Sequence, residues 1–216
     1  MNREGIKLFS GMLVLTAGFT AGAMVTAHLF FKILTIAGVL LTAFVMAFFR
    51  DPERTIPEEA NLVVSPADGK IIEIVDEEEQ DFIGAPTTRV SIFLSIFDVH
   101  INRIPISGRV AYLKYRPGAF LQAFKKEASL KNEQTIIGIE NTNTKLLFKQ
   151  IAGILARRIV CNLKEGDEVK KGMRFGMIKF GSRVDIFLPK NIDLKVRIGQ
   201  KVQGGTSIIG VINHDS

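Results

Sequence analysis

Few side chains in this sequence could carry acid–base or nucleophilic chemistry, which narrows the search for catalytic residues. The chain has three histidines and one cysteine. His28 lies in a long apolar run and His214 near the end of the chain, whereas His100, in IFDVHINR, follows an apolar segment and has polar neighbours. Such a histidine is a candidate general acid or base, and equally a structural residue at a strand end. Cys161, the lone cysteine, can form neither an internal disulfide nor a cysteine-based metal cluster.

Two further candidates lie at predicted turns. Asp68, in SPADGK, is expected in a tight turn between two apolar strands, where it either caps the turn or takes part in catalysis. Gly181 and Ser182 open the predicted buried strand of MIKFGSRVDIFLPK, and the charged residues Arg183 and Asp185 follow. A glycine at such a place marks either a bend that packing requires or a bond that the protein must expose.

Other common catalytic motifs are absent from the sequence. It has no Gly-x-Ser-x-Gly elbow, no phosphate-binding glycine loop before a lysine and a hydroxyl, and no His/Asp/Glu spacing typical of zinc ligands. The net charge of +6 is modest for 216 residues. We therefore expect neither hydrolysis nor phosphoryl transfer by the usual routes, no metal site and no nucleic-acid partner.

The first part of the chain is typical of a membrane anchor. Residues 8–31 and 33–49 lack charged side chains, and Lys32 separates them. A bilayer core about 30 Å thick needs about 20 apolar helical residues. The pattern predicts a membrane-anchoring helical hairpin over residues 1–49 with its turn at Lys32, rather than a cleaved signal peptide. Flanking basic residues favour the cytoplasmic side of the cell membrane for both ends: Arg3, Lys7, Arg50 and Arg54.

The remainder, residues 50–216, is typical of a mainly β domain because it is rich in valine, isoleucine, phenylalanine and glycine. The acidic segment 76–81 is expected to be an exposed loop. A motif G-x-x-V-x-x-G begins at Gly166 and again at Gly199, and each copy predicts a hairpin turn. This repeat favours a quasi-symmetric β-sandwich of the lipoyl or biotinyl type, a barrel-sandwich hybrid. No lysine stands in a carrier-type hairpin, so a swinging-arm carrier is not expected.

Six ordered segments, from Phe48 almost to the end, resemble the short membrane-associated phosphatidylserine decarboxylases: FFRDPER, SPADGKI, IFLSIFDVHINR, YRPGAF, ARRIVC and RFGMIKFGSRVDIFLP. The resemblance implies that Ser182 attacks the carbonyl of Gly181 and that the chain cleaves itself there. The products would be a large chain, 1–181, and a small chain, 182–216, which form a heterodimer and could pair further. A covalent pyruvoyl group derived from Ser182 would be the cofactor, without pyridoxal phosphate or metal.

The resemblance also implies roles for two of the candidates. Asp68 and His100 match the segments that supply the base for self-cleavage, and the choice between them stays open. His100 is the expected proton donor in turnover. Longer family members carry a second histidine three residues after the first, where this chain has Arg103.

A lipid substrate follows from the same resemblance. The expected reaction is decarboxylation of phosphatidylserine to phosphatidylethanolamine in phospholipid biosynthesis. Arg116 is a candidate for binding the phosphate or carboxylate of the substrate. In the segment GAFLQAFKK, apolar side chains could enter the lipid beside basic ones that meet phosphates, or they could cover the core: Phe120, Leu121, Phe124, Lys125 and Lys126.

Two alternatives stay open. The substrate could be an archaeal ether-linked serine lipid, archaetidylserine, because the head group reacts while the tails differ. The chain could instead be a non-catalytic, membrane-anchored lipoyl-like adaptor in which Gly181 and Ser182 form only a bulge.

Overall fold

The computed structural model describes residues 3–125, 127–154, 159–179 and 181–213. The chain divides into two compact units, Met1–Pro52 and Glu53–Ser216. Lys126, His214 and the first half of the ARRIVC segment lie outside the described residues.

The N-terminal unit is a pair of apolar helices, α1 (Arg3–Thr26) and α2 (Leu29–Phe48). Both are long and apolar enough to cross a membrane. They pack closely through small residues, because a Cβ on Gly38 would overlap the Thr16 side chain and the Thr16 and Thr42 hydroxyls lie 3.5 Å apart.

The position of the helical turn differs from the prediction. The chain reverses at Ala27, whose φ is 54°, and not at Lys32, which lies inside α2. Charge alone did not locate the turn because a lysine near a helix end can extend its aliphatic stem along an apolar surface.

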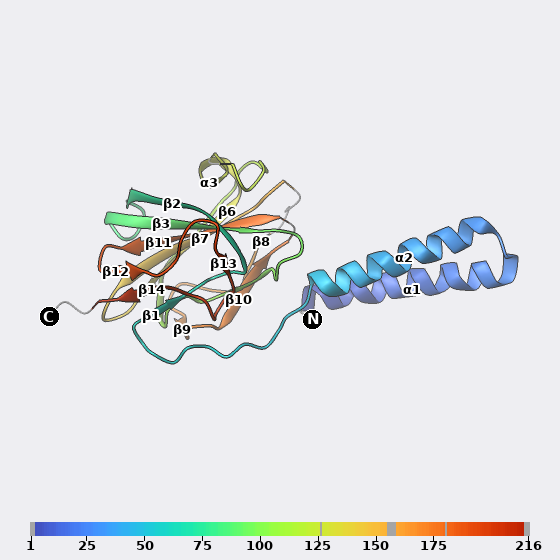
Figure 1. The fold of residues 1–216 in the computed structure, drawn as a ribbon, viewed down its shortest axis with the longest axis horizontal. Helices are drawn as coiled ribbons and strands as arrows, with labels where there is room; N and C mark the ends of the chain where they lie inside the picture. The colour runs from blue at the N-terminus through green and yellow to red at the C-terminus, as the bar shows by residue number, and fades with distance from the viewer. Residues whose placement is uncertain (1–2, 126, 155–158, 180, 214–216) are drawn as a thin grey trace. The chain divides into compact units, whose positions relative to one another are not determined.

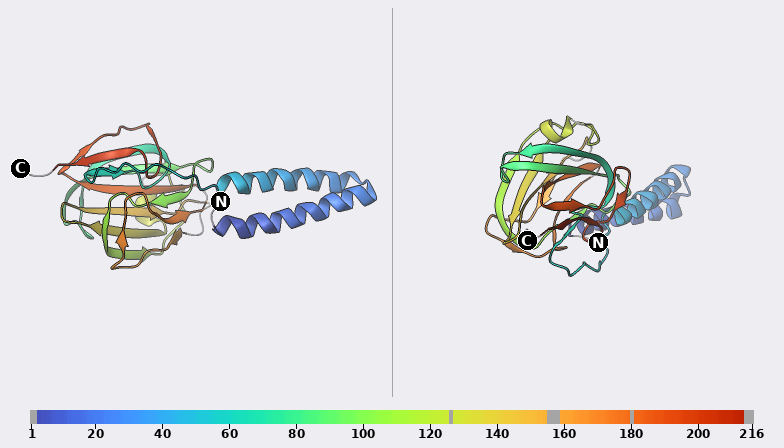
Figure 2. Two further views of the ribbon diagram at one scale, coloured as in Figure 1. Left: turned by 90° about the horizontal axis from the view of Figure 1, so that it is seen from below. Right: turned by 60° about the vertical axis from the view of Figure 1, so that its left-hand side comes forward.

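The larger unit is mainly β, and its strands form three antiparallel sheets (Figure 1). An eight-stranded sheet has the order β13-β2-β3-β11-β7-β6-β5-β9 and curls into a half-barrel (Figure 2), and two three-stranded sheets have the orders β1-β14-β12 and β4-β10-β8. The bounds are β1 Leu62–Val64, β2 Gly69–Glu79, β3 Ala85–Leu94, β4 Ile101–Arg103, β5 Gly108–Arg116, the short helix α3 Ala128–Lys131, β6 Gln134–Glu140, β7 Lys145–Ile151, β8 Ile159–Cys161, β9 Glu168–Val169, β10 Arg174–Ile178, β11 Ser182–Pro189, β12 Ile192–Leu194, β13 Lys201–Val202 and β14 Ile208–Ile212.

The repeated motif occupies equivalent places at the two edges of the large sheet. The copy at Gly166 contains β9, which pairs with β5, and the copy at Gly199 contains β13, which pairs with β2. The glycines of each copy flank a two-residue edge strand rather than the predicted hairpin turn. All four have positive φ, between 79° and 91°, a conformation that glycine adopts more readily than other residues, which explains why these positions are glycines. The sheet is therefore quasi-symmetric.

The acidic segment is mostly strand rather than the predicted exposed loop. Residues 76–79 continue β2, which pairs with β3 along its length. Glu79 is 3% exposed, and its carboxylate accepts hydrogen bonds from the backbone N–H groups of the next turn, at Asp81, Phe82 and Ile83. The pairing with β3 outweighs the preference of a charged run for a loop, and Glu79 caps the turn that ends it.

Candidate active site

Gly181 and Ser182 lie where three neighbouring strands end. Ser182 is the first residue of β11, which runs between β3 and β7. It pairs with Leu94, the last residue of β3, and the next residue of β11 pairs with Ile151, the last residue of β7. Gly181 has a φ of 42°, in the left-handed region that glycine adopts most readily. The Gly181–Ser182 bond is thus held at a bend on the rim of the half-barrel.

Ser182 points its side chain to the inner face of the sheet. Side chains alternate along a strand, and Val184, Ile186 and Leu188 all belong to the main hydrophobic core. Ser182 is fully buried, and its hydroxyl has no hydrogen-bond partner among the described residues. A buried hydroxyl without a partner costs about 1–3 kcal/mol, so such a group in a native fold calls for a functional explanation.

His100 lies directly before a strand that adjoins this rim. It is fully buried and immediately precedes β4, where Ile101 pairs with Met177 of β10. The end of β10 leads, within a few residues, to Gly181. The Nδ1 atom of His100 lies 2.9 Å from the carbonyl oxygen of Asp98, which can only accept a hydrogen bond. Nδ1 therefore carries the proton in neutral His100, and Nε2 is left as the basic nitrogen.

A polar contact joins the strand of His100 to the sheet of Ser182. Asn102, two residues after His100, accepts a hydrogen bond of 2.8 Å from the side-chain amide of Gln150. Gln150 is on β7 and pairs with Val184, on the face of β11 that carries Ser182. The strand that follows His100 is thus hydrogen-bonded to β7, the neighbour of the strand that Ser182 begins.

The described hydrogen bonds of Asp68 involve neither His100 nor Ser182. Its carboxylate accepts hydrogen bonds from the Arg54 guanidinium at 2.7 Å and from the Gly204 N–H at 2.9 Å. The described part of the chain shows no contact from this carboxylate to His100 or Ser182. Arg103 lies beside the same turn, because its N–H donates to the carbonyl of Pro66.

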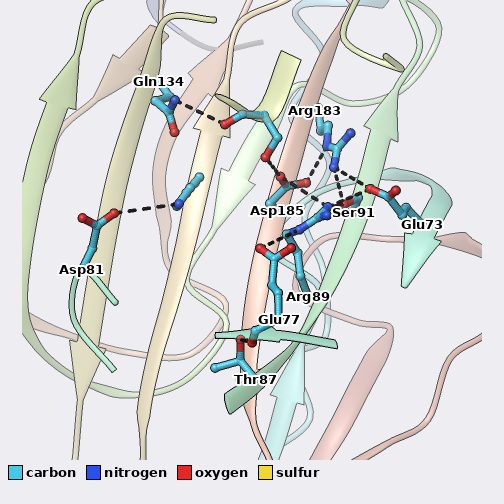
Figure 3. Close-up of polar contacts among 11 residues, drawn as sticks. Glu73, Glu77, Asp81, Thr87, Arg89, Ser91, Gln134, Arg183 and Asp185 are labelled. Atoms are coloured by element: carbon cyan, nitrogen blue, oxygen red, sulfur yellow. Dashed lines mark hydrogen bonds and ion pairs between the residues drawn. The ribbon is translucent and has the colours of Figure 1, made fainter. Parts of the chain in front are cut away.

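The outer face of β11 carries a buried network of charges (Figure 3). The Arg183 guanidinium contacts Asp185 at 2.6 Å, Ser91 at 2.7 Å and Glu73 at 3.1 Å. Arg89 contacts the same Glu73 at 2.8 Å. Arg183 is 1% exposed and Asp185 is fully buried, so the network fixes the backbone directly after Ser182.

This network affects the acidity of its members. Burial raises the pKa of Glu73, but hydrogen bonds and positive charge from Arg89 and Arg183 outweigh it and bring the pKa below its ordinary value. Burial also lowers the pKa of Lys149, on the same face, against the opposing effect of Asp81.

The segment 117–125 folds over the sheet near this rim. Asn132 is 1% exposed and anchors the segment by exchanging two hydrogen bonds with the backbone of Leu121, at 2.8 and 2.9 Å. Phe124 packs edge-to-face on Phe93 of β3, with ring centroids 6.1 Å apart. Phe120 and Phe124 remain 39% and 57% exposed.

The other predicted substrate contact, Arg116, lies at the end of β5. Its guanidinium is 3.8 Å from the carboxylate of Asp81, and its side chain is 41% exposed. Arg116 pairs with Gln134, which pairs with Ile151, which in turn pairs with Arg183. Arg116 is therefore level with the start of β11, three strands away from it.

The sequence showed Arg183 and Asp185 but did not identify their partners. The signal was visible, because two charged residues in an otherwise apolar strand require buried partners. Gly153 and Asn132, which contact the rim, gave no such signal, since their roles depend on residues brought close only by the fold.

Comparison with known proteins identifies the family of the chain. The family model described as phosphatidylserine decarboxylase matches residues 41–210. A phosphatidylserine decarboxylase proenzyme of Carboxydothermus hydrogenoformans is 46% identical over 213 residues, which cover 98% of this chain and 96% of the relative. The proenzyme of Salinibacter ruber is 46% identical over 95% of this chain and 87% of its own, and that of Chlorobium phaeobacteroides strain DSM 266 is 50% identical over 77% and 78%. The chain belongs to the phosphatidylserine decarboxylase family.

Proposed function

We propose that this protein is a membrane-bound, pyruvoyl-dependent phosphatidylserine decarboxylase that matures by cleaving itself between Gly181 and Ser182. The observation that carries the proposal is the buried Ser182 hydroxyl, which has no partner among the described residues and follows a glycine with positive φ. The relatives are named proenzymes, which supports maturation by cleavage.

Self-cleavage uses atoms of the chain itself. The Ser182 oxygen attacks the Gly181 carbonyl carbon, the C–N bond breaks, and the nitrogen takes up a proton to leave an ester. Loss of the Ser182 α-proton then breaks the bond between Cβ and oxygen and releases the Gly181 carboxylate. The resulting dehydroalanine takes up water and loses ammonia, which leaves a pyruvoyl group at the start of residues 182–216.

His100 is suited to the proton transfers. Its Nε2 is the basic nitrogen, and general acid–base catalysis by a positioned histidine contributes about 10²–10⁴-fold. Asp68 is the other candidate base for self-cleavage, but its contacts with Arg54 and Gly204 favour a role in holding the turn beside Arg103. We therefore assign both proton transfers to His100.

The residues at the rim fit a pyruvoyl group. Conversion of Ser182 removes a hydroxyl that makes no described hydrogen bond, so no partner is left unsatisfied. When present, the group supplies an electrophilic ketone that binds the substrate amine and accepts electrons as carbon dioxide leaves. His100 would then return a proton to the substrate carbon.

The fold keeps the two cleaved chains together as a heterodimer. β11, in the small chain, lies between β3 and β7 of the large chain, and β14 pairs with β1. The quasi-symmetric sheet, with the repeated motif at its two edges, supports a lipoyl-like barrel-sandwich for residues 50–216.

An apolar rim around the cleavage site suits a lipid substrate. Phe97 follows β3, and Ile154 follows Gly153. Leu130 adjoins Ser129, whose hydroxyl donates to Asp185 at 2.6 Å. With the two phenylalanines of the 117–125 segment, five large apolar side chains, between 39% and 76% exposed, lie on segments next to the ends of β3, β7 and β11: Phe97, Phe120, Phe124, Leu130 and Ile154. We propose that this rim enters the bilayer, with Lys125 and Arg116 near the phosphate and carboxylate of the substrate.

The helical pair of residues 1–49 would anchor the enzyme in the cell membrane. Basic residues on both sides of the pair support a cytoplasmic position for residues 50–216.

The experiment that tests the function uses purified full-length protein in mixed vesicles. With phosphatidylserine in the vesicles, carbon dioxide and phosphatidylethanolamine should appear, and a Ser182→Ala protein should release neither. An archaeal ether-linked serine lipid, tested in parallel, distinguishes the two lipid classes. Wild-type protein that is folded, bound to vesicles and inactive on both lipids would contradict the proposal and favour a non-catalytic adaptor.

A further inference from the structure

Gly153 lies against the bond that is proposed to break. It follows β7 by two residues, and β7 pairs with the start of β11. A Cβ placed on Gly153 would fall on the carbonyl oxygen of Gly181, far inside van der Waals contact, and 3.3 Å from the Cβ of Ala123. The oxygen of Gly181 therefore occupies the space that a side chain at position 153 would need.

The backbone beside Gly153 has little freedom to make room. The N–H of Ala152 donates to the carbonyl of Glu133 at 2.9 Å, and the carbonyl of Ala152 accepts a hydrogen bond of 2.7 Å from Asn132. Gly153 and Ala152 are both buried. A methyl group at position 153 would thus displace the Gly181 carbonyl more readily than it would move its own strand.

The position of this oxygen matters for attack by Ser182. As the hydroxyl adds to the carbonyl carbon, that carbon becomes tetrahedral and its oxygen gains negative charge. Attack requires the carbonyl to face the nucleophile, and a misplacement of about 1 Å can slow a reaction about a hundredfold.

We propose that Gly153 is a positioning residue for self-cleavage: the absence of a side chain admits the Gly181 carbonyl oxygen and holds it in the orientation in which Ser182 can attack. This inference rests on the proposed self-cleavage of the chain. It assigns Gly153 no part in substrate decarboxylation.

The test follows processing of full-length Gly153→Ala over time by denaturing electrophoresis and intact mass. We expect cleavage to be about a hundredfold slower than in the wild type. Added hydroxylamine, which cleaves esters, should release little small chain, because the ester itself would form slowly.

Gly108→Ala is the matched control. A Cβ on Gly108 would also meet a backbone carbonyl oxygen, that of Glu140. Glu140 ends β6 and pairs with the start of β7, whereas Ser182 lies near the other end of β7. Gly108→Ala that reaches the folded state should be processed at the wild-type rate. Slow processing of folded Gly108→Ala equal to that of Gly153→Ala would overturn the inference, because any crowded glycine would then suffice.

A second variant covers the case in which Gly153→Ala does not fold. Ala123→Val brings a methyl group toward the same space from the 117–125 segment, outside the sheet, and should also slow cleavage. Folded Gly153→Ala or folded Ala123→Val that cleaves at the wild-type rate would overturn the inference while the proposed function stands. An uncleaved wild-type protein would instead overturn the proposed function.

Discussion

The two faces of β11 differ in the hydrogen bonding of their buried polar groups. On the inner face the Ser182 hydroxyl is buried with no hydrogen-bond partner among the described residues. On the outer face Arg183 and Asp185 are just as buried, yet each makes several short hydrogen bonds or ion pairs. The comparison suggests a division of labour, in which the outer face holds the strand in place and the inner face keeps one reactive group available.

The largest expected effect is on the inner face. Ser182→Ala removes the attacking oxygen, so the protein should remain one chain and release no carbon dioxide from phosphatidylserine. Ser182→Thr and Ser182→Cys keep a nucleophile and should cleave slowly. Denaturing electrophoresis of the three variants checks this, and normal cleavage of Ser182→Ala would remove Ser182 from the mechanism.

His100 comes next. His100→Ala should lower the rate of decarboxylation about 10²–10⁴-fold, because a positioned general acid–base is lost. The fraction of cleaved chain, measured on the same sample, separates the two proposed roles. A cleaved but inactive protein would restrict His100 to turnover, and wild-type activity would exclude it from the site.

The outer face should matter for stability rather than for chemistry. In a Ser182→Ala background, where every sample is a single chain, Arg183→Met should lower the free energy of unfolding by about 3–5 kcal/mol, because it leaves Asp185 buried without its closest charged partner. In the double variant with Arg183→Met and Asp185→Asn, the loss of unfolding free energy should be smaller than the sum of the losses in the two single variants, because the residues are in contact.

Arg109→Met is the control for this comparison. The ion pair of Arg109 with Glu140 is 2.7 Å long, close to the 2.6 Å of the buried Arg183–Asp185 pair, but its side chains are 54% and 30% exposed. Its loss should change the free energy of unfolding by less than about 1 kcal/mol. Urea unfolding in detergent measures all of these proteins, and equal effects of Arg183→Met and Arg109→Met would contradict the division between the two faces.

The smallest expected effect is a pH dependence from Glu73. The folded protein holds the pKa of Glu73 below its ordinary value of 4.5, so its contribution to stability is present above that pH and is lost as the pH falls through the folded pKa. In the Ser182→Ala background, Glu73→Gln should therefore be destabilising at pH 7, and the difference should shrink below about pH 4.5. A difference that does not change between pH 7 and pH 3 would contradict the assigned ion pairs.

The sequence predicted the residues that are local in the chain better than those that the fold brings together. Apolar residues follow Ser182 at every second position along β11, and the mainly β character of the domain was visible in composition. The partners of Arg183 come from β2 and β3, about a hundred residues earlier, so pairing could not be read from the strand itself. The same holds for Asp68, whose contact with Gly204 spans 136 residues.

Two of the predictions that failed gave local pattern too much weight. The acidic run at 76–79 became strand, since pairing with β3 decides its conformation. The helical turn moved from Lys32 to Ala27, because a lysine is compatible with the first turn of a helix at an apolar surface.

Intact mass spectrometry of denatured wild-type protein tests the central claim most directly. The account predicts two chains, residues 1–181 and 182–216, with the small chain one ammonia lighter than simple hydrolysis would give and blocked to amino-terminal sequencing. A single intact chain that still converts phosphatidylserine to phosphatidylethanolamine would contradict it.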